Sequence, residues 1–295
     1  MSMEGIYQTY QSLLFSLAYR MLGSVMDSED IVQEAFISFN QLPNHEHIEN
    51  KKAYLCKIVT NRCLDLIRSS AKQREVYVGP WLPEPLLEIE NSANDPSQAF
   101  FQQESISTAY LLLLQQLNAI ERAVFLLREV FQYSYDEIAE ILGKSNANCR
   151  QIFHRAKKSM EYDPKKQHSI SMAESTVKEF VQSIINGNVN QLLELVSEDV
   201  AMYSDGGGKV KAAQIPIFGA TRVVQLLQNL MKMYAGKSTI KYTSVNGLPG
   251  LILTIDDHLQ YVYSFAFSGN RIQTIYSVAN PDKLRHLKWK TPYDH

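Results

Sequence analysis

The apolar residues of this 295-residue chain change their spacing near residue 163, and that change constrains the fold more than any other feature. Up to Met160 they recur every three or four positions, as in Leu14, Leu17 and Met21, which is the spacing of helices that bury one face. After two further helical stretches, apolar and polar residues alternate, which is the spacing of strands. The sequence therefore predicts an all-helical part followed by an α+β part.

The helical part divides in two at a proline-containing linker. Residues 1–72 and residues 98–163 each carry several helical stretches, so we predict two all-α domains there. Residues 73–97 between them show little helical periodicity and contain Pro80, Pro83, Pro85 and Pro96. Proline cannot continue a helix and restricts the residue before it, so this segment is predicted to be an extended linker.

A third domain is predicted over residues 170–295. It begins with two helices and a short strand, and a glycine run and a helix near residues 221–234 follow. Four alternating segments then span residues 238–245, 251–255, 259–267 and 271–278. Because short turns separate them, we predict antiparallel hairpins in a curved sheet with helices packed on one face.

Charge is distributed unevenly along the chain. The net charge of −2, from 29 Lys and Arg against 31 Asp and Glu, is unusual for a nucleic-acid-binding protein. Between residues 144 and 166, however, only two residues are acidic and seven are basic: Lys144, Arg150, Arg155, Lys157, Lys158, Lys165 and Lys166. This local stripe is suited to phosphates.

Several protein classes are excluded by what the sequence lacks. The N-terminus has no signal-peptide pattern and no stretch approaches the about 20 apolar residues that cross a bilayer, so we expect a cytoplasmic location and no membrane partner. Cys56, Cys63 and Cys149 are widely spaced at apolar helical positions and are expected to be buried thiols. We expect no bound metal, no cofactor and no enzymatic activity.

Residues 133–160 have the pattern of a helix-turn-helix. A short amphipathic helix is predicted to end at Gly143, Ser145 can cap the next helix, and Cys149 and Phe153 begin its buried stripe. The outward face then carries Asn146, Asn148, Arg150, Gln151, His154 and Arg155, followed by Lys157 and Lys158. Such side chains read base edges or bind phosphates. An ordinary helical hairpin fits the spacing equally well, but the basic stripe favours DNA.

The stretch from Leu111 to Lys158 resembles the promoter −35 reading domain of extracytoplasmic-function (ECF) sigma factors. The N-terminal helical block resembles the other half of that family. The resemblance implies that Asp30, Gln33 and Glu34 dock on the β′ clamp helices of RNA polymerase, and that the β flap is a further contact. Asp30, Gln33 and Glu34 lie on one helix face and offer acceptors to a basic partner, although a solvated acidic face has the same pattern.

The segment Lys51–Arg68 resembles the −10 reading helix of the same family. Opening a promoter requires basic residues along single-stranded DNA. The resemblance assigns this contact to Lys51, Lys52, Lys57, Asn61, Arg62 and Arg68. Residues 1–72 and 98–163 are thus expected to be sigma regions 2 and 4, binding core polymerase and promoter DNA.

Three further motifs resemble one ECF group, numbered forty-one, which carries a C-terminal SnoaL-like (nuclear transport factor 2-like) domain. That resemblance implies a cone-shaped α+β domain that regulates sigma activity in cis, by autoinhibition. The expected interdomain residues are Trp81, Leu82 and Pro83 in the linker, Asp205, Gly206, Gly207, Gly208 and Lys209 in the glycine loop, and Asn280, Pro281, Asp282 and Lys283 near the C-terminus. Because exposed apolar bulk is costly, Trp81 is expected to dock on this domain or on polymerase.

Other functions remain open at this point. SnoaL-like relatives include ketosteroid isomerases, in which a carboxylate base faces a hydrogen-bond donor across an apolar pocket. The available side chains of those types are Asp199, Tyr203, Asp205, His258, Tyr261 and Tyr263. The third domain is therefore a regulatory domain, a small-molecule sensor or an isomerase-like enzyme attached to a DNA-binding part. A conventional dimeric repressor is a further alternative.

Overall fold

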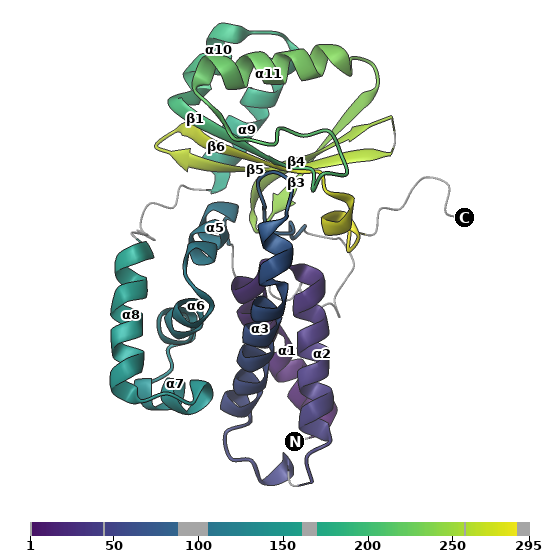
Figure 1. The fold of residues 1–295 in the computed structure, drawn as a ribbon. Helices are drawn as coiled ribbons and strands as arrows, with labels where there is room; N and C mark the ends of the chain where they lie inside the picture. The colour runs from purple at the N-terminus through teal and green to yellow at the C-terminus, as the bar shows by residue number, and fades with distance from the viewer. Residues whose placement is uncertain (1, 44, 88–105, 161–169, 257, 288–295) are drawn as a thin grey trace, which may run out of the picture. The chain divides into compact units, whose positions relative to one another are not determined.

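The computed structural model describes residues 2–43, 45–87, 106–160, 170–256 and 258–287 (Figure 1). It separates into two compact units, which are described one at a time. The first contains the described residues up to Val76 and those from Tyr110 to Met160, and the second contains Tyr77–Leu87, Ile106–Ala109 and everything from Ile170 onward. The linker residues 88–97, the segment 98–105 and the basic residues Lys165 and Lys166 lie outside the described residues.

The first unit is entirely helical, as expected. Its elements are α1 (Met3–Leu22), α2 (Val25–Asn40), a 3-10 turn (His45–His47), α3 (Lys51–Glu75), α5 (Thr108–Gln116, whose first two residues belong to the second unit), α6 (Ala119–Phe125), a π-helical turn (Leu126–Val130), α7 (Tyr135–Leu142) and α8 (Asn146–Met160). Local signals set the boundaries: the Ser24 hydroxyl caps α2, and Gly23 (φ 70°) ends α1 in the left-handed conformation.

Two buried arginines join the N-terminal helices to the later ones within this unit. The Arg122 guanidinium on α6 donates to the backbone carbonyls of Met21 at the end of α1 and of Leu117 (3.1 Å). Arg20 on α1 lies 5.9 Å from the centre of the Phe131 ring. Carbonyls at a helix end lack intrahelical partners, so a guanidinium that donates to them satisfies both groups.

The second unit contains a six-stranded mixed sheet covered on one face by helices (Figure 1). The elements are α9 (Ile170–Ile185), α10 (Val189–Leu195), β1 (Val196–Asp205), β2 (Ile217–Phe218), α11 (Ala220–Met233), β3 (Ser238–Val245), β4 (Leu248–Ile255), β5 (Leu259–Ser268), β6 (Arg271–Val278) and a 3-10 turn (Pro281–Leu284). The strand order is β2-β1-β6-β5-β4-β3, in which β1 runs parallel to β6 and the other neighbours are antiparallel.

The predicted fold class is confirmed, with two differences in the strands. The first strand is ten residues long, whereas the sequence predicted a short one. The prediction was too short because a register shift between Val196 and Ala201 interrupts the alternation and leaves Glu198 and Asp199 exposed. The two-residue strand β2 pairs with Ala201 and Met202 and is too short to leave a sequence pattern. The meander from β3 to β6 matches the four predicted segments.

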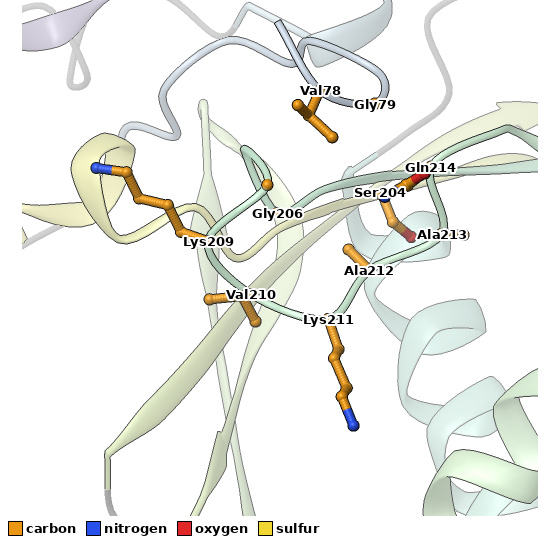
Figure 2. A pocket seen from close by; sticks show the side chains of 11 residues that line it. Val78, Gly79, Ser204, Gly206, Lys209, Val210, Lys211, Ala212, Ala213 and Gln214 are labelled. Carbon is orange, nitrogen blue, oxygen red and sulfur yellow. The ribbon is translucent and has the colours of Figure 1, made fainter.

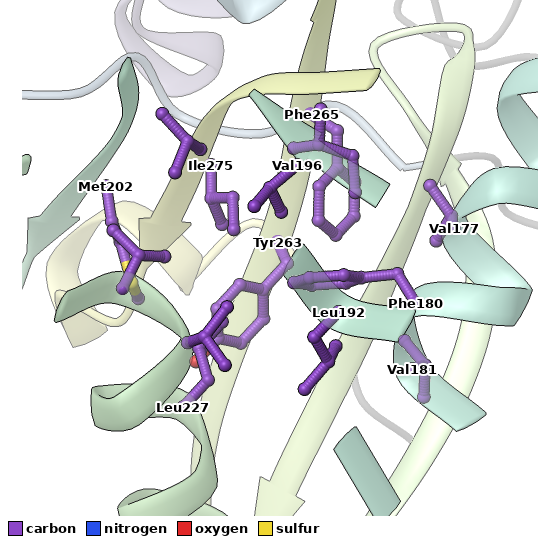
Figure 3. Packing of buried hydrophobic residues seen from close by; sticks show 14 of the residues in the cluster. Val177, Phe180, Val181, Leu192, Val196, Met202, Leu227, Tyr263, Phe265 and Ile275 are labelled. Atoms are coloured by element: carbon purple, nitrogen blue, oxygen red, sulfur yellow. The ribbon is translucent and has the colours of Figure 1, made fainter. Parts of the chain in front are cut away.

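The core of this unit lies between the sheet and its three helices. Figure 3 shows Phe180 of α9 and Phe265 of β5 side by side among Val177, Leu192 and Val196. The two rings meet edge to face with their centres 6.2 Å apart. The face of the sheet that meets the three helices is closely packed, and this packing holds the sheet in place.

Candidate nucleic-acid interface and linker-binding site

The helix-turn-helix is formed by α7 and α8. The Ser134 hydroxyl and the Glu137 carboxylate make a reciprocal capping box at the start of α7, and Gly143 (φ 62°) ends it in the left-handed conformation. The Ser145 hydroxyl accepts a hydrogen bond from the Asn148 backbone N–H at 3.2 Å, as predicted. Phe153 on the buried face of α8 lies 6.2 Å, centre to centre, from the Phe125 ring.

On the outward face of α8, some side chains contact other side chains and others are exposed without such contacts. Asn146 donates to the Asp136 carboxylate (2.6 Å) and accepts from Arg150 Nε (2.7 Å), and the Arg150 guanidinium lies 4.7 Å from the Tyr135 ring centre. Lys157 is paired with Glu129 at 3.2 Å. Four others are exposed and engage no side chain of the described residues: Asn148, Gln151, Arg155 and Lys158. His154 is also exposed, with its ring edge toward Phe153.

The exposed face of α2 carries the acidic residues predicted to dock on polymerase. Asp30, Gln33 and Glu34 are all exposed. Ile37, one turn further along, is 57% exposed although it is a large apolar residue. A single exposed apolar residue is common on protein surfaces, so Ile37 does not by itself identify a contact. Sequence patterning missed it because Ile37 falls within an otherwise regular helix.

The basic residues predicted for the −10 contact are not equivalent. Arg62 on α3 forms an ion pair with Glu34 and donates to the Ser38 hydroxyl at 2.9 Å. Lys51 donates to the carbonyls of Glu46 (3.2 Å) and Ile48 (2.9 Å) in the preceding loop. Lys57 is half-buried, whereas Asn61 and Arg68 are exposed, with Arg68 paired to Asp65.

One face of α3 is covered by the residues that precede the helix-turn-helix. The Tyr133 hydroxyl lies 3.3 Å from Cys56 Sγ, and the Lys52 ammonium lies 5.4 Å from the Tyr133 ring centre. Burial raises the pKa of the Cys56 thiol to about 11, although the Tyr133 hydrogen bond and the Lys52 charge act the other way. All three cysteines are buried and free, as expected.

Asp205 organises a separate site in the second unit, which we call the linker-binding site. This residue ends β1 and is fully buried. One carboxylate oxygen accepts from the Tyr77 hydroxyl (2.5 Å) and the Gly207 N–H (3.1 Å). The other accepts from the Leu82 N–H (2.8 Å) and the Lys283 ammonium (2.7 Å). A buried carboxylate is thus fully hydrogen-bonded, and two of its donors belong to the linker.

Lys283 completes the site from the C-terminal 3-10 turn. Its ammonium donates to the Leu82 carbonyl and lies 4.1 Å from the Trp81 ring centre and 4.9 Å from that of Tyr77. Two aromatic faces beside a desolvated cation are stabilising. Trp81 therefore docks on the C-terminal domain. Burial and, after it, the Asp205 carboxylate raise the pKa of the Tyr77 hydroxyl, so it remains a donor.

A second group of contacts lies further along the linker. Asn246, in the β3–β4 turn, accepts from the Leu86 N–H (2.7 Å) through its side-chain oxygen and donates its own backbone N–H to the Leu86 carbonyl (2.7 Å). The Pro85 carbonyl lies 2.8 Å from His286 Nε2. Leu82, Leu86 and the prolines between them are buried. The described half of the linker is therefore part of a folded core.

The glycine run is required because neighbouring atoms lie too close to its backbone to leave room for side chains. A Cβ on Gly206 would collide with the Val210 carbonyl, and one on Gly207 (φ 58°) would collide with the Asn280 side chain. Figure 2 shows the loop from Gly206 to Gln214 opposite Val78 and Gly79 of the linker. Lys209 turns away from the linker and pairs with Asp282. Burial is therefore not uniform across this motif, since Asp205 is enclosed and Lys209 is exposed.

Sequence reasoning named Trp81, Asp205 and Lys283 but missed Tyr77 and Asn246. Tyr77 lies just before the proline-rich stretch and carried no pattern of its own. Asn246 lies in one of the short turns predicted between the strand segments, and its positive φ of 54° fits a turn residue as well. Only the sheet topology shows that the β3–β4 turn meets the linker.

The carboxylates available for an isomerase-like reaction are not placed for one. Asp205 is committed to four donors at the linker-binding site, and Asp199 is exposed on β1. Tyr203 stacks on Tyr276, 5.8 Å centre to centre. Tyr261 and Tyr263 line a pocket in which no described lining residue is acidic. A carboxylate base facing a donor is thus lacking among the described residues of that pocket.

The described part of the chain lacks two kinds of feature. None of its helices is long and apolar enough to span a membrane. Within the same residues, no group of three His, Cys, Asp or Glu side chains is arranged to hold a metal ion.

Comparisons with known proteins point in one direction. The family models described as Sigma-70 region 2 and Sigma-70, region 4 match residues 6–73 and 107–160. The chain is 29% identical to the ECF RNA polymerase sigma factor SigJ of Mycobacterium tuberculosis, over 94% of this chain and 92% of that protein. It is 26% identical to the probable ECF RNA polymerase sigma factor SigI of the same species, over 96% and 94%. A crystal structure of SigJ matches with a TM-score of 0.78 at 27% identity, over 95% of this chain and 98% of that one.

Replacing Asp205 by Asn tests the linker-binding site. The substitution keeps the size of the side chain but leaves the buried Lys283 ammonium without its counter-charge, so the unfolding free energy should fall by about 3–5 kcal/mol. Urea unfolding measures this loss. Asp282→Asn, which removes the exposed partner of Lys209, is the matched control and should cost no more than about 1 kcal/mol. Equal small losses in both variants would contradict the assignment.

Proposed function

Because the chain belongs to the ECF group of the sigma-70 family and carries a SnoaL-like C-terminal domain, we propose that it directs core RNA polymerase to specific promoters and is regulated in cis by that domain. Sigma factors bind core polymerase and promoter DNA. The proposed division is residues 1–72 for region 2, 73–97 for the linker, 98–163 for region 4 and 170–295 for the regulatory domain. The protein itself performs no chemistry in this proposal, and its place of action is the cytoplasm, where polymerase is found.

Polymerase docking is assigned to the exposed face of α2. Asp30, Gln33 and Glu34 offer acceptors to basic groups on the β′ clamp helices, and Ile37 supplies apolar contact beside them. Region 4 is assigned to the β flap by family resemblance. Glu34 already pairs with Arg62, so docking on polymerase would exchange that intramolecular partner for an intermolecular one.

Promoter recognition is divided between the two helical parts. On α8, the exposed Gln151 and Arg155 have base-reading geometry and Lys158 suits phosphates, while Arg150 is oriented by Asn146 and Tyr135. On α3, Asn61 and Arg68 are exposed, and Lys52 is engaged by Tyr133. The Tyr133 contact would have to separate before the full basic face of α3 could bind the −10 strand.

Regulation in cis rests on the linker-binding site. Only Val76 separates the end of α3 from Tyr77, the first linker residue bound to Asp205. A linker fixed at residues 77–87 shortens the free chain between the two promoter-reading parts, which limits the spacings they can adopt. We propose that this restraint is autoinhibitory.

The alternatives are less well supported. An isomerase-like enzyme needs a carboxylate in its pocket, and no described lining residue supplies one. Full-length similarity to two ECF sigma factors also disfavours a conventional repressor. A small-molecule ligand in the C-terminal domain remains compatible with the proposal.

Charge reversal on α2 tests polymerase docking. The double variant Asp30→Lys, Glu34→Lys should weaken binding to purified core polymerase by at least about tenfold, because acceptors facing a basic partner become like charges. Surface-immobilised core enzyme gives the affinity. The double variant Glu194→Lys, Glu198→Lys, at exposed positions of α10 and β1, makes the same charge change in the other unit and should leave the affinity unaltered. Unchanged affinity in the double variant would overturn this docking face.

Two substitutions on α8 separate base reading from phosphate binding. Gln151→Ala should cost about 1–3 kcal/mol at promoters with the preferred base and relax the preference at a single position of the −35 element. Lys158→Ala should weaken binding to all sequences and reduce the salt slope by about one. Fluorescence anisotropy of holoenzyme on promoter duplexes measures both. Identical behaviour of the two variants would contradict the roles assigned.

Cysteine reactivity reports whether the α3–Tyr133 contact opens. In a variant that keeps only Cys56, maleimide labelling should be slow in the free protein and accelerate on addition of core polymerase, because separation exposes the thiol. Cys149, which is buried on α8 and not on α3, is the single-cysteine control, and its labelling rate should not change. Tyr133→Ala should label quickly without polymerase. No acceleration at Cys56 would show that the contact persists in the holoenzyme.

A further inference from the structure

The C-terminal domain contains a pocket that none of the proposed contacts uses. It has a volume of about 330 Å³ and borders the packed core, since Met202 and Tyr263 of the core in Figure 3 also line the pocket. Its apolar wall comes mainly from α11 and from the ends of β4, including Leu226, Leu230, Leu253 and Ile255. Ligand pockets in proteins begin at about this size and are predominantly apolar in the same way.

A few polar groups converge on this apolar wall. Tyr261 and Tyr263 line it, and the Tyr261 hydroxyl donates to the backbone carbonyl of Lys211 at 3.4 Å. Burial raises the pKa of Tyr263 to about 12, so that its hydroxyl is protonated at neutral pH. Lys211 is exposed at the rim, and no carboxylate of the described residues pairs with its ammonium. With no acidic residue among the described lining, the pocket presents one positive charge and neutral donors.

The pocket shares a wall with the linker-binding site. Lys211, Ala212 and Ala213 line it, and the same loop meets the linker, where Gly79 approaches Gln214 and Gly208 approaches Val78. In Figure 2 the Lys211 side chain points away from Val78 and Gly79. One short loop thus has the linker on one side and an apolar pocket on the other.

We propose that this pocket binds an apolar carboxylate, with the hydrocarbon chain against α11 and β4 and the carboxylate at Lys211 and the tyrosine hydroxyls. This inference extends the proposed regulation in cis. The pocket wall is complete in the conformation that binds the linker. A ligand with a higher affinity for this conformation than for one in which the loop is rearranged strengthens linker binding by the ratio of those two affinities. The ligand therefore acts as a co-inhibitor.

Decanoate is the first probe, titrated into the full-length protein by calorimetry. It should bind at one site, and decyltrimethylammonium, with the same chain and the opposite charge, should not. Lys211→Glu should weaken decanoate binding by about tenfold or more, since it removes a charge-assisted contact. Lys241→Glu, on an exposed position of β3 outside the pocket, should have no effect. No binding, or equal binding of the two probes, would overturn the site.

Hydrogen exchange then tests the coupling to the linker. Decanoate should slow amide exchange in residues 77–87 of the wild-type protein and leave it unchanged in Leu253→Trp, in which the pocket is filled. Ala213→Phe provides a second filled pocket from the loop side. Binding without slower exchange would overturn the co-inhibitor role. Neither measurement involves transcription, so failure here is distinguishable from failure of the sigma-factor proposal.

Discussion

The buried ion pair between Asp205 and Lys283 is the interaction on which the regulatory half of the structure depends. Moving two charges out of water is costly, and the cost is offset only when their remaining hydrogen-bonding groups are satisfied. Here the linker supplies those partners through Tyr77 and Leu82. The linker is therefore a component of the C-terminal fold, and releasing it would leave a buried carboxylate and ammonium short of partners. That dependence makes the linker a natural point of control.

In the helical unit, surface residues also have intramolecular partners that a bound macromolecule would have to replace. Several residues with family-implied roles already have intramolecular partners: Glu34 with Arg62, Arg150 with Asn146, and Lys52 with Tyr133. Exposed ion pairs contribute at most about 1 kcal/mol, so polymerase or DNA can replace them at low cost. The Tyr133–Cys56 contact is buried and should be harder to replace. Access to α3, the proposed −10 reading helix, is thus limited more by packing than by charge.

Local signals explain why some features were predictable and others were not. Gly143 and Ser145 define the helix-turn-helix within a few residues, so its boundaries follow from capping alone. The Asp205–Lys283 pair depends on β1 running parallel to β6, with Asp205 opposite Val278, and a strand interrupted by a register shift gives no such indication. Arg122 likewise looked like an ordinary helical residue. Its partner carbonyl, that of Met21, is 101 residues away in the chain.

Promoter-directed run-off transcription with purified core polymerase tests the central claim most directly, using the full-length wild-type chain and Asp205→Asn. The account predicts a promoter-specific transcript that depends on the added chain and that increases in the variant, because the linker is no longer fixed. A transcript that is unchanged or reduced in Asp205→Asn would contradict autoinhibition through the linker. Absence of any promoter-specific transcript with either protein would contradict the account as a whole.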